Sequence, residues 1–329
     1  MYSDNLSILY TNAFLFLAIF SIDTPSDSYI KIPLAISPAK LSAKNRLEPE
    51  ASYDPERSIF MIYDCHLHTD FSGDCETPAR LQIEQAIRLG MRELCITDHL
   101  DHNASFCQGL FELDMPSYFK QFNALKKEYE GKIHLNLGVE LGLTLREAPF
   151  LKDFYKIYGN QLDFIIGSSH FLGNCDPYDA ACWEGRSEQD VLSAYFEASL
   201  KRVSSLYPLF DSYAHLDYIV RYAPKKNREF KPEEYFPLID PILKLLIENG
   251  KCLECNTGGY KYGLGEPNPC RQILMRYRSL GGEAITIGSD AHQPAYVGGS
   301  FEACRSLLLD CGFRYYAVFH KRSPEMISL

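Results

Sequence analysis

Two histidines separated by one residue, His66 and His68, follow a short apolar run at residues 61–63. Residues two apart in an extended chain point to the same side, so both imidazoles are expected to converge. The carboxylate of Asp74 follows in a loop that contains glycine. Imidazoles and a carboxylate together are typical ligands of a divalent transition metal. A lone pair of this kind is more often a surface or core pair, so the metal hypothesis depends on what the rest of the chain supplies.

Further candidate ligands recur where apolar, strand-like runs stop. Leu94-Cys95-Ile96, for example, leads into Thr97-Asp98-His99, and six of the nine histidines follow runs of this kind. The carboxyl ends of the strands in a parallel barrel form the edge on which active sites are built. These side chains are therefore expected to meet at that edge. The candidates that follow the later runs are His99, Glu140, His170, His215, Asp290 and His292.

The segments between these runs carry helix signals. Thr77-Pro78 is a typical N-cap and first-turn pair, and Gly90 is a typical stop for the helix between them. Strand-like and helical segments alternate, which predicts a parallel sheet. Seven strands are expected, at residues 61–65, 93–96, 133–139, 163–166, 211–214, 251–255 and 284–287. Helices are expected at 79–89, 117–129, 145–158, 188–206, 232–248, 269–280 and 299–309, with a loop beside the site at 172–185 and a last apolar run at 315–319.

The order and composition of these motifs resemble the polymerase-and-histidinol-phosphatase (PHP) superfamily. The resemblance is carried by His66-x-His68, Thr97-Asp98-His99, Gly138-Val139-Glu140, Ser169-His170, Ala214-His215 and Ser289-Asp290-Ala291-His292. Within the superfamily, the chain is most similar to the histidinol-phosphate phosphatases of the HisJ/HisK type, through the Asn256–Gly259 turn and Gly265-Glu266-Pro267. The similarity runs from about Met61 to the C-terminus. It implies a distorted (β/α)7 barrel, which agrees with the seven expected strands.

The resemblance also implies how the ligands are shared among three divalent metal ions. The first ion would be held by His66, His68, Glu140 and Asp290, the second by Glu140, His170 and His215, and the third by Asp74, His99 and His292. Glu140 would then bridge two ions. Mixed imidazole and carboxylate ligands favour Zn, Fe or Mn over Mg or Ca. Asp74 occupies a position that is often histidine in relatives, and the aspartate resembles the phosphatase branch.

Two further residues are candidates for catalytic roles. Asp98 would orient an imidazole or, as the resemblance suggests, assist proton transfer to the leaving alkoxide. A role as a turn or helix-capping residue is the alternative. Arg186 would reach the phosphate as a charge-assisted donor or lie solvated at the surface. Arg221 is a similar but weaker candidate.

The remaining histidines are weaker candidates. His102 lies three residues after His99, so it either lines the substrate pocket or has a structural role. His134 begins a strand far from the carboxyl end, and His320 follows the last apolar run. Structural or surface roles are expected for both.

The amino-acid composition limits the kinds of molecule that the protein is expected to bind. The 33 Lys and Arg residues against 43 Asp and Glu give a net charge of −10, which argues against a nucleic acid held by general basic attraction. We expect a small-molecule phosphomonoester as the substrate and no association with a membrane. Eleven cysteines spread over a long chain favour reduced thiols and a cytoplasmic location.

Residues 1–60 lack the regular strand and helix patterns of the rest of the chain. The apolar stretch 8–20 is too short for a confident membrane span, and no Lys or Arg precedes it as in a secretory signal. The polar stretch 23–57 has no clear periodicity. We expect residues 1–60 to be a dispensable extension and 61–329 to be the metallophosphatase domain. A weak targeting segment is the alternative.

The sequence leaves three hypotheses for the function. The resemblance implies hydrolysis of L-histidinol phosphate in histidine biosynthesis. A PHP phosphoesterase acting on nucleotides or nucleic-acid ends is the second hypothesis, because fold does not fix substrate; the sequence has no Lys/Arg cluster near the site to support it. The third is a non-catalytic PHP module. Such a module is expected to have lost ligands, whereas all nine positions here keep metal-binding side chains.

Overall fold

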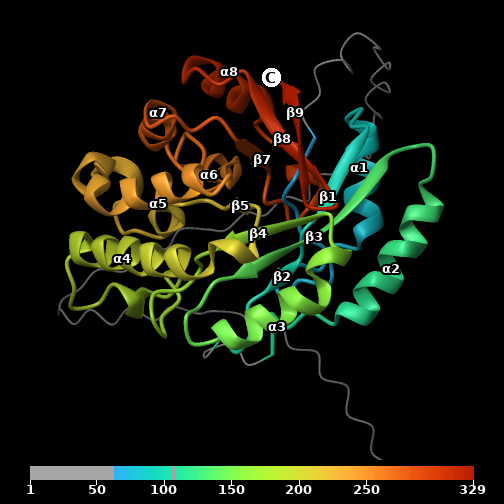
Figure 1. Ribbon diagram of the computed structural model, residues 1–329. Coiled ribbons are helices and arrows are strands. Elements are labelled where there is room, and N and C mark those ends of the chain that lie inside the picture. The colour runs from blue at the N-terminus through green and yellow to red at the C-terminus, as the bar shows by residue number, and fades with distance from the viewer. Residues whose placement is uncertain (1–62, 105–108) are drawn as a thin grey trace, which may run out of the picture. The chain divides into compact units, whose positions relative to one another are not determined.

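The computed structural model describes residues 63–104 and 109–329 (Figure 1). The expected extension at 1–60 lies outside the described residues. Parallel strands form one sheet in the order β1-β3-β4-β5-β6-β7, with β2 pairing to β3 directly after β1. Nearly every residue of these strands is buried, as expected for a parallel sheet covered on both faces. The strands are β1 (Glu93–Ile96), β2 (His99–Leu100), β3 (His134–Gly142), β4 (Phe164–Ser168), β5 (Ser212–Tyr213), β6 (Cys252–Asn256) and β7 (Ile285–Gly288).

The expected first strand at 61–65 is not continuous where the chain is described, and this prediction is corrected. Instead, Asp64 forms an isolated parallel bridge with Leu94 of β1, and Leu67 forms another with Ala291, just after β7. The segment alternates between its two neighbours, so neither pairing is long enough to be a regular strand. It still joins both edges of the sheet and completes the expected distorted (β/α)7 barrel.

The helices lie outside the strands and connect them in sequence (Figure 1). Six of the seven predicted helices are found with ends that differ by up to three residues, the helix expected at 232–248 begins four residues later, and the short helix α6 was not predicted. Within the described residues, no helix has the length and apolar composition needed to cross a membrane. The helices are α1 (Ala79–Arg88), α2 (Met115–Glu128), α3 (Ala148–Tyr158), α4 (Glu188–Leu206), α5 (Phe236–Glu248), α6 (Gly258–Lys261), α7 (Arg271–Ser279) and α8 (Phe301–Asp310).

Two details of the helices differ from the prediction. The N-cap of α1 is Pro78, without a side-chain capping bond, so the predicted Thr77 cap is wrong. The Thr77 hydroxyl instead donates to the carbonyl oxygen of His292 at 2.8 Å, which ties the start of α1 to the chain after β7. The helix expected at 232–248 begins as a separate 3-10 turn, Pro232–Tyr235, before α5.

The last apolar run forms one strand of a hairpin that the sequence did not predict, β8 (Tyr315–His320) with β9 (Ser323–Ser328). Phe319 stacks on Phe164, the first residue of β4, at 4.8 Å between ring centroids. Arg322 pairs with Asp211, which lies just before β5, at 2.9 Å. Both contacts are at the amino ends of barrel strands. The hairpin therefore covers the end of the barrel opposite to the predicted site.

We expect replacement of Phe319 by alanine to lower the free energy of unfolding by about 3 kcal/mol, because the ring is buried and its removal leaves a cavity against Phe164. Denaturant unfolding measures the change. Met326→Ala in the neighbouring strand is the control, since that side chain is 45% exposed and should change stability by less than about 0.5 kcal/mol. Equal effects of the two substitutions would contradict packing of the hairpin against the barrel.

Candidate metal centre

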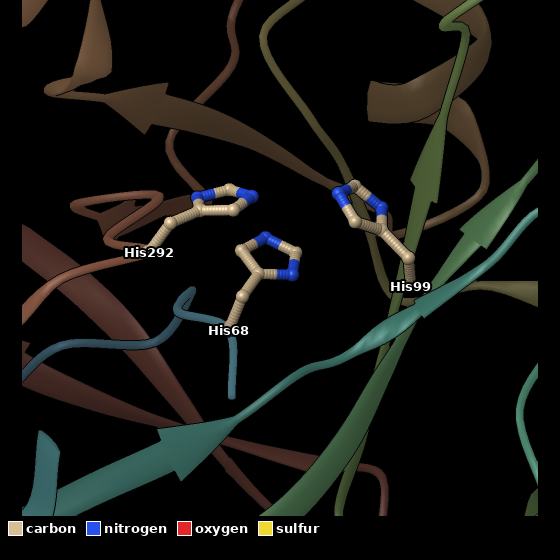
Figure 2. A group of neighbouring side chains, drawn as sticks. All are labelled: His68, His99 and His292. Carbon is tan, nitrogen blue, oxygen red and sulfur yellow. The ribbon is translucent and has the colours of Figure 1, made fainter. Parts of the chain in front are cut away.

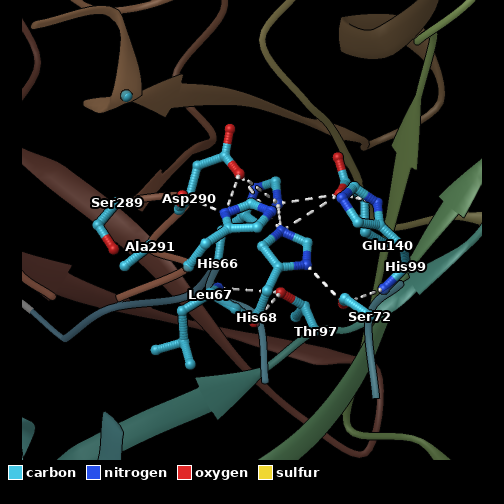
Figure 3. A network of polar contacts seen from close by, with 12 residues as sticks. His66, Leu67, His68, Ser72, Thr97, His99, Glu140, Ser289, Asp290 and Ala291 are labelled. Carbon is cyan, nitrogen blue, oxygen red and sulfur yellow. Dashed lines mark hydrogen bonds and ion pairs between the residues drawn. The ribbon is translucent and has the colours of Figure 1, made fainter. Parts of the chain in front are cut away.

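All nine predicted ligands lie at the carboxyl ends of the barrel strands, and Figure 3 shows the central group. Each position follows from the topology. Parallel strands end at one edge, and the ligands lie at these ends or within a few residues of them. His66 and His68 come from the segment that closes the barrel, Asp74 from the loop after it, His99 from β2, Glu140 from β3, His170 from the end of β4, His215 from the end of β5, and Asp290 and His292 from the chain after β7.

The carboxylate of Glu140 is the centre of this group. Its side chain has no exposed surface. Five imidazoles lie around its two oxygens, and the bridging position predicted for Glu140 stays a prediction. Oε1 lies 3.1 Å from His170 Nε2 and 2.9 Å from His215 Nε2, and Oε2 lies 3.2 Å from His66 Nε2, 3.5 Å from His68 Nε2 and 2.9 Å from His99 Nδ1.

Several of these rings are held from behind by a hydrogen-bond acceptor. The Nδ1 atom of His66 lies 2.6 Å from a carboxylate oxygen of Glu254, and that of His170 lies 3.0 Å from Asp101. A carboxylate or carbonyl oxygen only accepts, so the imidazole nitrogen that faces it carries the hydrogen. The Nε2 atom of each of these rings points toward Glu140 and would be the atom that binds a metal ion once it has lost its proton.

The close approach of these nitrogen and oxygen atoms favours a cation between them. Lone pairs of imidazole and carboxylate repel unless a positive charge lies between them. His99 Nδ1 and Glu140 Oε2 are 2.9 Å apart, yet neither has an aligned hydrogen bond, although both are buried. Protons on every ring would instead gather several imidazolium ions around one carboxylate. The donor set fits divalent cations, and three overlapping groups have ligand atoms close enough for one: His66, His68 and Glu140; His99, Glu140 and His170; and His68, His99 and His292.

The charges of the group also perturb its proton affinities. Burial raises the pKa of Glu140, but His66, His170 and His99 outweigh this effect and hold that pKa well below its ordinary value. Burial lowers the pKa of His68, and His99 and His292 lower it further. Burial also lowers the pKa of His66, His99 and His170, but nearby carboxylates outweigh it and raise these pKa values above the ordinary histidine value. Metal binding would therefore have to displace protons from these rings.

A second part of the group lies closer to solvent. His68 stacks between His99 and His292, with ring centroids 4.1 and 4.2 Å apart, as Figure 2 shows. Asp74 Oδ2 lies 3.1 Å from His292 Nε2 and 3.7 Å from His99 Nε2. Asp74, His99 and His292, predicted to hold the third ion, are therefore brought together.

Asp290 connects the ligands to a buried arginine. Its Oδ1 lies 3.3 Å from His68 Nε2, and its Oδ2 accepts from Nη1 of Arg221 at 2.8 Å. Asp290 and His215 have positive φ angles, +57° and +24°, which are rare for residues with a side chain. Backbone strain of this kind persists where the surroundings enforce it, and it is common at functional sites.

The two residues predicted to be catalytic lie in different surroundings, since Asp98 is buried and Arg186 is exposed. Both oxygens of Asp98 are bonded within the fold, to Thr69 N, Thr69 Oγ1 and Ser72 Oγ at 2.6–2.7 Å. Burial raises the pKa of Asp98, although these bonds oppose the increase. Ser72 Oγ in turn lies 3.0 Å from His68 Nδ1, so Asp98 orients His68 through Ser72. Arg186 is exposed.

A cavity of about 420 Å³ opens over the ligands, a size that suits a small molecule. Arg221 lines it, whereas Arg186 and Asp98 are absent from its described walls. His102 lines a different cavity and stacks on Phe150 at 3.5 Å. Besides the ligands, the walls include Asp101, Phe111, Phe171, Asp176, Tyr178, Tyr218, Arg221, Tyr222, Lys261, Tyr262 and Gln293.

The sequence reasoning missed Glu254 and Asp101, which hold His66 and His170. A signal existed for Glu254, because it interrupts the apolar run of β6, and a buried carboxylate requires a partner. Asp101 lies two residues after His99 and had a weaker signal. Their side chains are 2% and 3% exposed.

The sequence of this chain is similar to those of known proteins. The PHP domain family model matches residues 64–258. The histidinol-phosphatase of Lactococcus lactis subsp. lactis (strain IL1403) is 31% identical over 258 residues, which cover 78% of this chain and 93% of that protein. A probable histidinol-phosphatase of Thermotoga maritima is 32% identical over 269 residues, which cover 79% and 97%.

A solved structure resembles the fold as well. The crystal structure of histidinol phosphate phosphatase from Lactococcus lactis, complexed with zinc, L-histidinol and phosphate, aligns with a TM-score of 0.73 at 30% sequence identity. The alignment covers 80% of this chain and 99% of that one.

Replacing Glu140 by glutamine keeps its size but removes the charge that five imidazoles face. We expect the unmodified protein, purified without a chelator, to contain more than one transition-metal ion per chain, and Glu140→Gln to contain fewer. Elemental analysis measures both. Glu128→Gln is the matched control, because that carboxylate lies at the surface and pairs with Arg80. Unchanged metal content in Glu140→Gln would refute the bridging role.

Proposed function

Because the chain belongs to the PHP domain family, we propose that it is a metal-dependent phosphatase that hydrolyses L-histidinol phosphate to L-histidinol and phosphate. The observation that carries the proposal is the buried Glu140 carboxylate surrounded by five imidazoles beneath a cavity of small-molecule size. The relative from Lactococcus lactis, crystallised with zinc, L-histidinol and phosphate, supports this choice of substrate.

We further propose that three divalent ions, Zn, Fe or Mn, are held as the sequence pattern implies, with Glu140 shared between two of them. When bound, such ions lower the pKa of an attacking water and neutralise charge on the phosphoryl oxygens. Three of the ligand imidazoles are already oriented by Glu254, Asp101 and Ser72, which reduces the reorganisation needed on binding.

Arg221 is suited to orient the phosphate. Its guanidinium has five N–H donors, of which three are used by Asn268, Asp290 and Asn256. The rings of Tyr218 and Tyr262 lie 5.2 and 4.9 Å from its central carbon and fix its plane. The remaining donors of a cation so held can meet an anion in the cavity without loss of side-chain entropy.

Asp98 supports catalysis in this proposal as a positioning residue that acts on His68 through Ser72. Proton transfer from Asp98 to the leaving alkoxide stays a separate prediction. Arg186 stays a second candidate for contact with the phosphate, because its side chain is long and exposed and could turn toward the cavity.

The proposed compartment is the cytoplasm. All ten described cysteines are free, and most are buried in the fold. Free thiols of this number and the transition-metal ligands suit a reducing environment.

Hydrolysis of a panel of phosphomonoesters by the purified, metal-loaded protein tests the proposed function. We expect L-histidinol phosphate to have the highest kcat/KM, because Arg221 and Lys261 can meet its phosphate while Asp176 and the aromatic walls can meet its cationic and imidazole groups. A higher kcat/KM for a dinucleotide or for single-stranded DNA would favour the nucleic-acid hypothesis instead.

Substitutions of the two arginines separate their roles. We expect Arg221→Lys to lower kcat/KM by about 10–100-fold, because lysine keeps the charge but loses directed donors worth about 1.5–3 kcal/mol. We expect Arg186→Gln to raise KM with little change in kcat, since an exposed guanidinium contributes attraction rather than fixed geometry. Unchanged KM in Arg186→Gln would assign this residue to the surface.

A further inference from the structure

A second group of metal-binding side chains lies at the opposite end of the barrel. Glu93 is the first residue of β1, His134 is the first residue of β3, and His320 is the last residue of β8. One ligand atom of each lies within 4.8 Å of the others. Figure 1 shows β8 and β9 beside β1, the arrangement that brings the three together.

The contacts in this group resemble those of a metal-binding histidine. His320 Nε2 lies 2.5 Å from Glu93 Oε1, while Nδ1 on the other side of the ring lies 3.6 Å from Glu325 Oε2. One nitrogen therefore faces the potential ligands, and the other faces the exposed Glu325 carboxylate at a distance longer than a hydrogen bond. Histidine ligands of metals commonly have an oxygen acceptor near this second nitrogen.

The group is also accessible to ions from solvent. His134 is exposed, and the His320 and Glu93 side chains are 36% and 13% exposed. The His134 and His320 rings lie edge to face, with centroids 5.6 Å apart. Asn136 donates to the same Glu93 oxygen that His320 contacts, which fixes the carboxylate. Two imidazoles and one fixed carboxylate are a ligand set that suits Zn²⁺ or a similar borderline cation.

We propose that Glu93, His134 and His320 bind one divalent transition-metal ion, with Zn²⁺ the natural occupant, at the seam between the barrel and its C-terminal hairpin. The ion would join β1 and β3 to β8, three strands that are distant in sequence. It would be a structural site with water completing its coordination, separate from the centre around Glu140. An ion that binds only the folded chain stabilises it by mass action.

Equilibrium dialysis of the metal-loaded protein against Zn²⁺, followed by elemental analysis, tests the proposal. We expect His134→Gln and His320→Gln each to hold one zinc ion fewer per chain than the unmodified protein. Added Zn²⁺ should raise the Tm of the unmodified protein, and the two variants should lose part of this increase. His102→Gln is the control for zinc content, because His102 also lies beside a carboxylate, Glu112, but outside the group.

Anomalous diffraction from crystals of the unmodified protein soaked in Zn²⁺ provides a test that needs no variant. A peak bounded by Glu93, His134 and His320 is expected. No peak there, or equal zinc content in the unmodified protein and the variants, would overturn the proposal and leave an ordinary ion pair between His320 and Glu93. Neither readout depends on the substrate, so failure here would not bear on the proposed phosphatase activity.

Discussion

A carboxylate with no access to solvent, Glu140, is placed where five imidazole rings meet, and its burial constrains everything around it. An unpaired buried carboxylate costs several kcal/mol, and neutral rings that present lone pairs do not offset this cost. Positive charge at the centre does. The barrel end is therefore a frame that holds carboxylate oxygens and imidazole nitrogens close together. Positive charge, carried by protons on the rings or by bound metal ions, makes these distances favourable.

The frame is built outward from that carboxylate. Glu254 and Asp101 fix the rings of His66 and His170, and Arg221 fixes Asp290. The backbone approaches closely here too, since a Cβ atom at Gly288 would lie 2.3 Å from the Cβ of His66. Glycine at this position lets β7 lie against the segment that closes the barrel. Two of these supports, Asp101 and Arg221, also line the cavity, so the same side chains hold the ligands and shape the cavity walls.

Sequence patterns predicted both the barrel and the clustering of the ligands at one end of it, because both predictions depend on local signals. Apolar runs mark the parallel strands, and histidines at their ends are unusual enough to be noticed. Glu254 and Asp101 were missed because their role depends on which ring lies opposite, and pairing between distant strands is not visible in one sequence. The Thr77 cap failed for the same reason, since a tertiary bond to His292 took its hydroxyl. The hairpin was missed because only β8 is apolar, while most of β9 is exposed.

The two ends of the barrel have different roles: the carboxyl ends of the strands carry the ligands, and the amino ends carry packing that stabilises the fold. At the carboxyl ends, strained residues such as Asp290 and His215 and buried like charges oppose stability, and bound cations can offset them. At the amino ends, the β8–β9 hairpin adds apolar packing through Phe319 and an ion pair through Arg322. Barrels commonly separate chemistry and stability in this way. The hairpin thus contributes stability at the end of the barrel opposite to the ligands, where no reaction geometry has to be preserved.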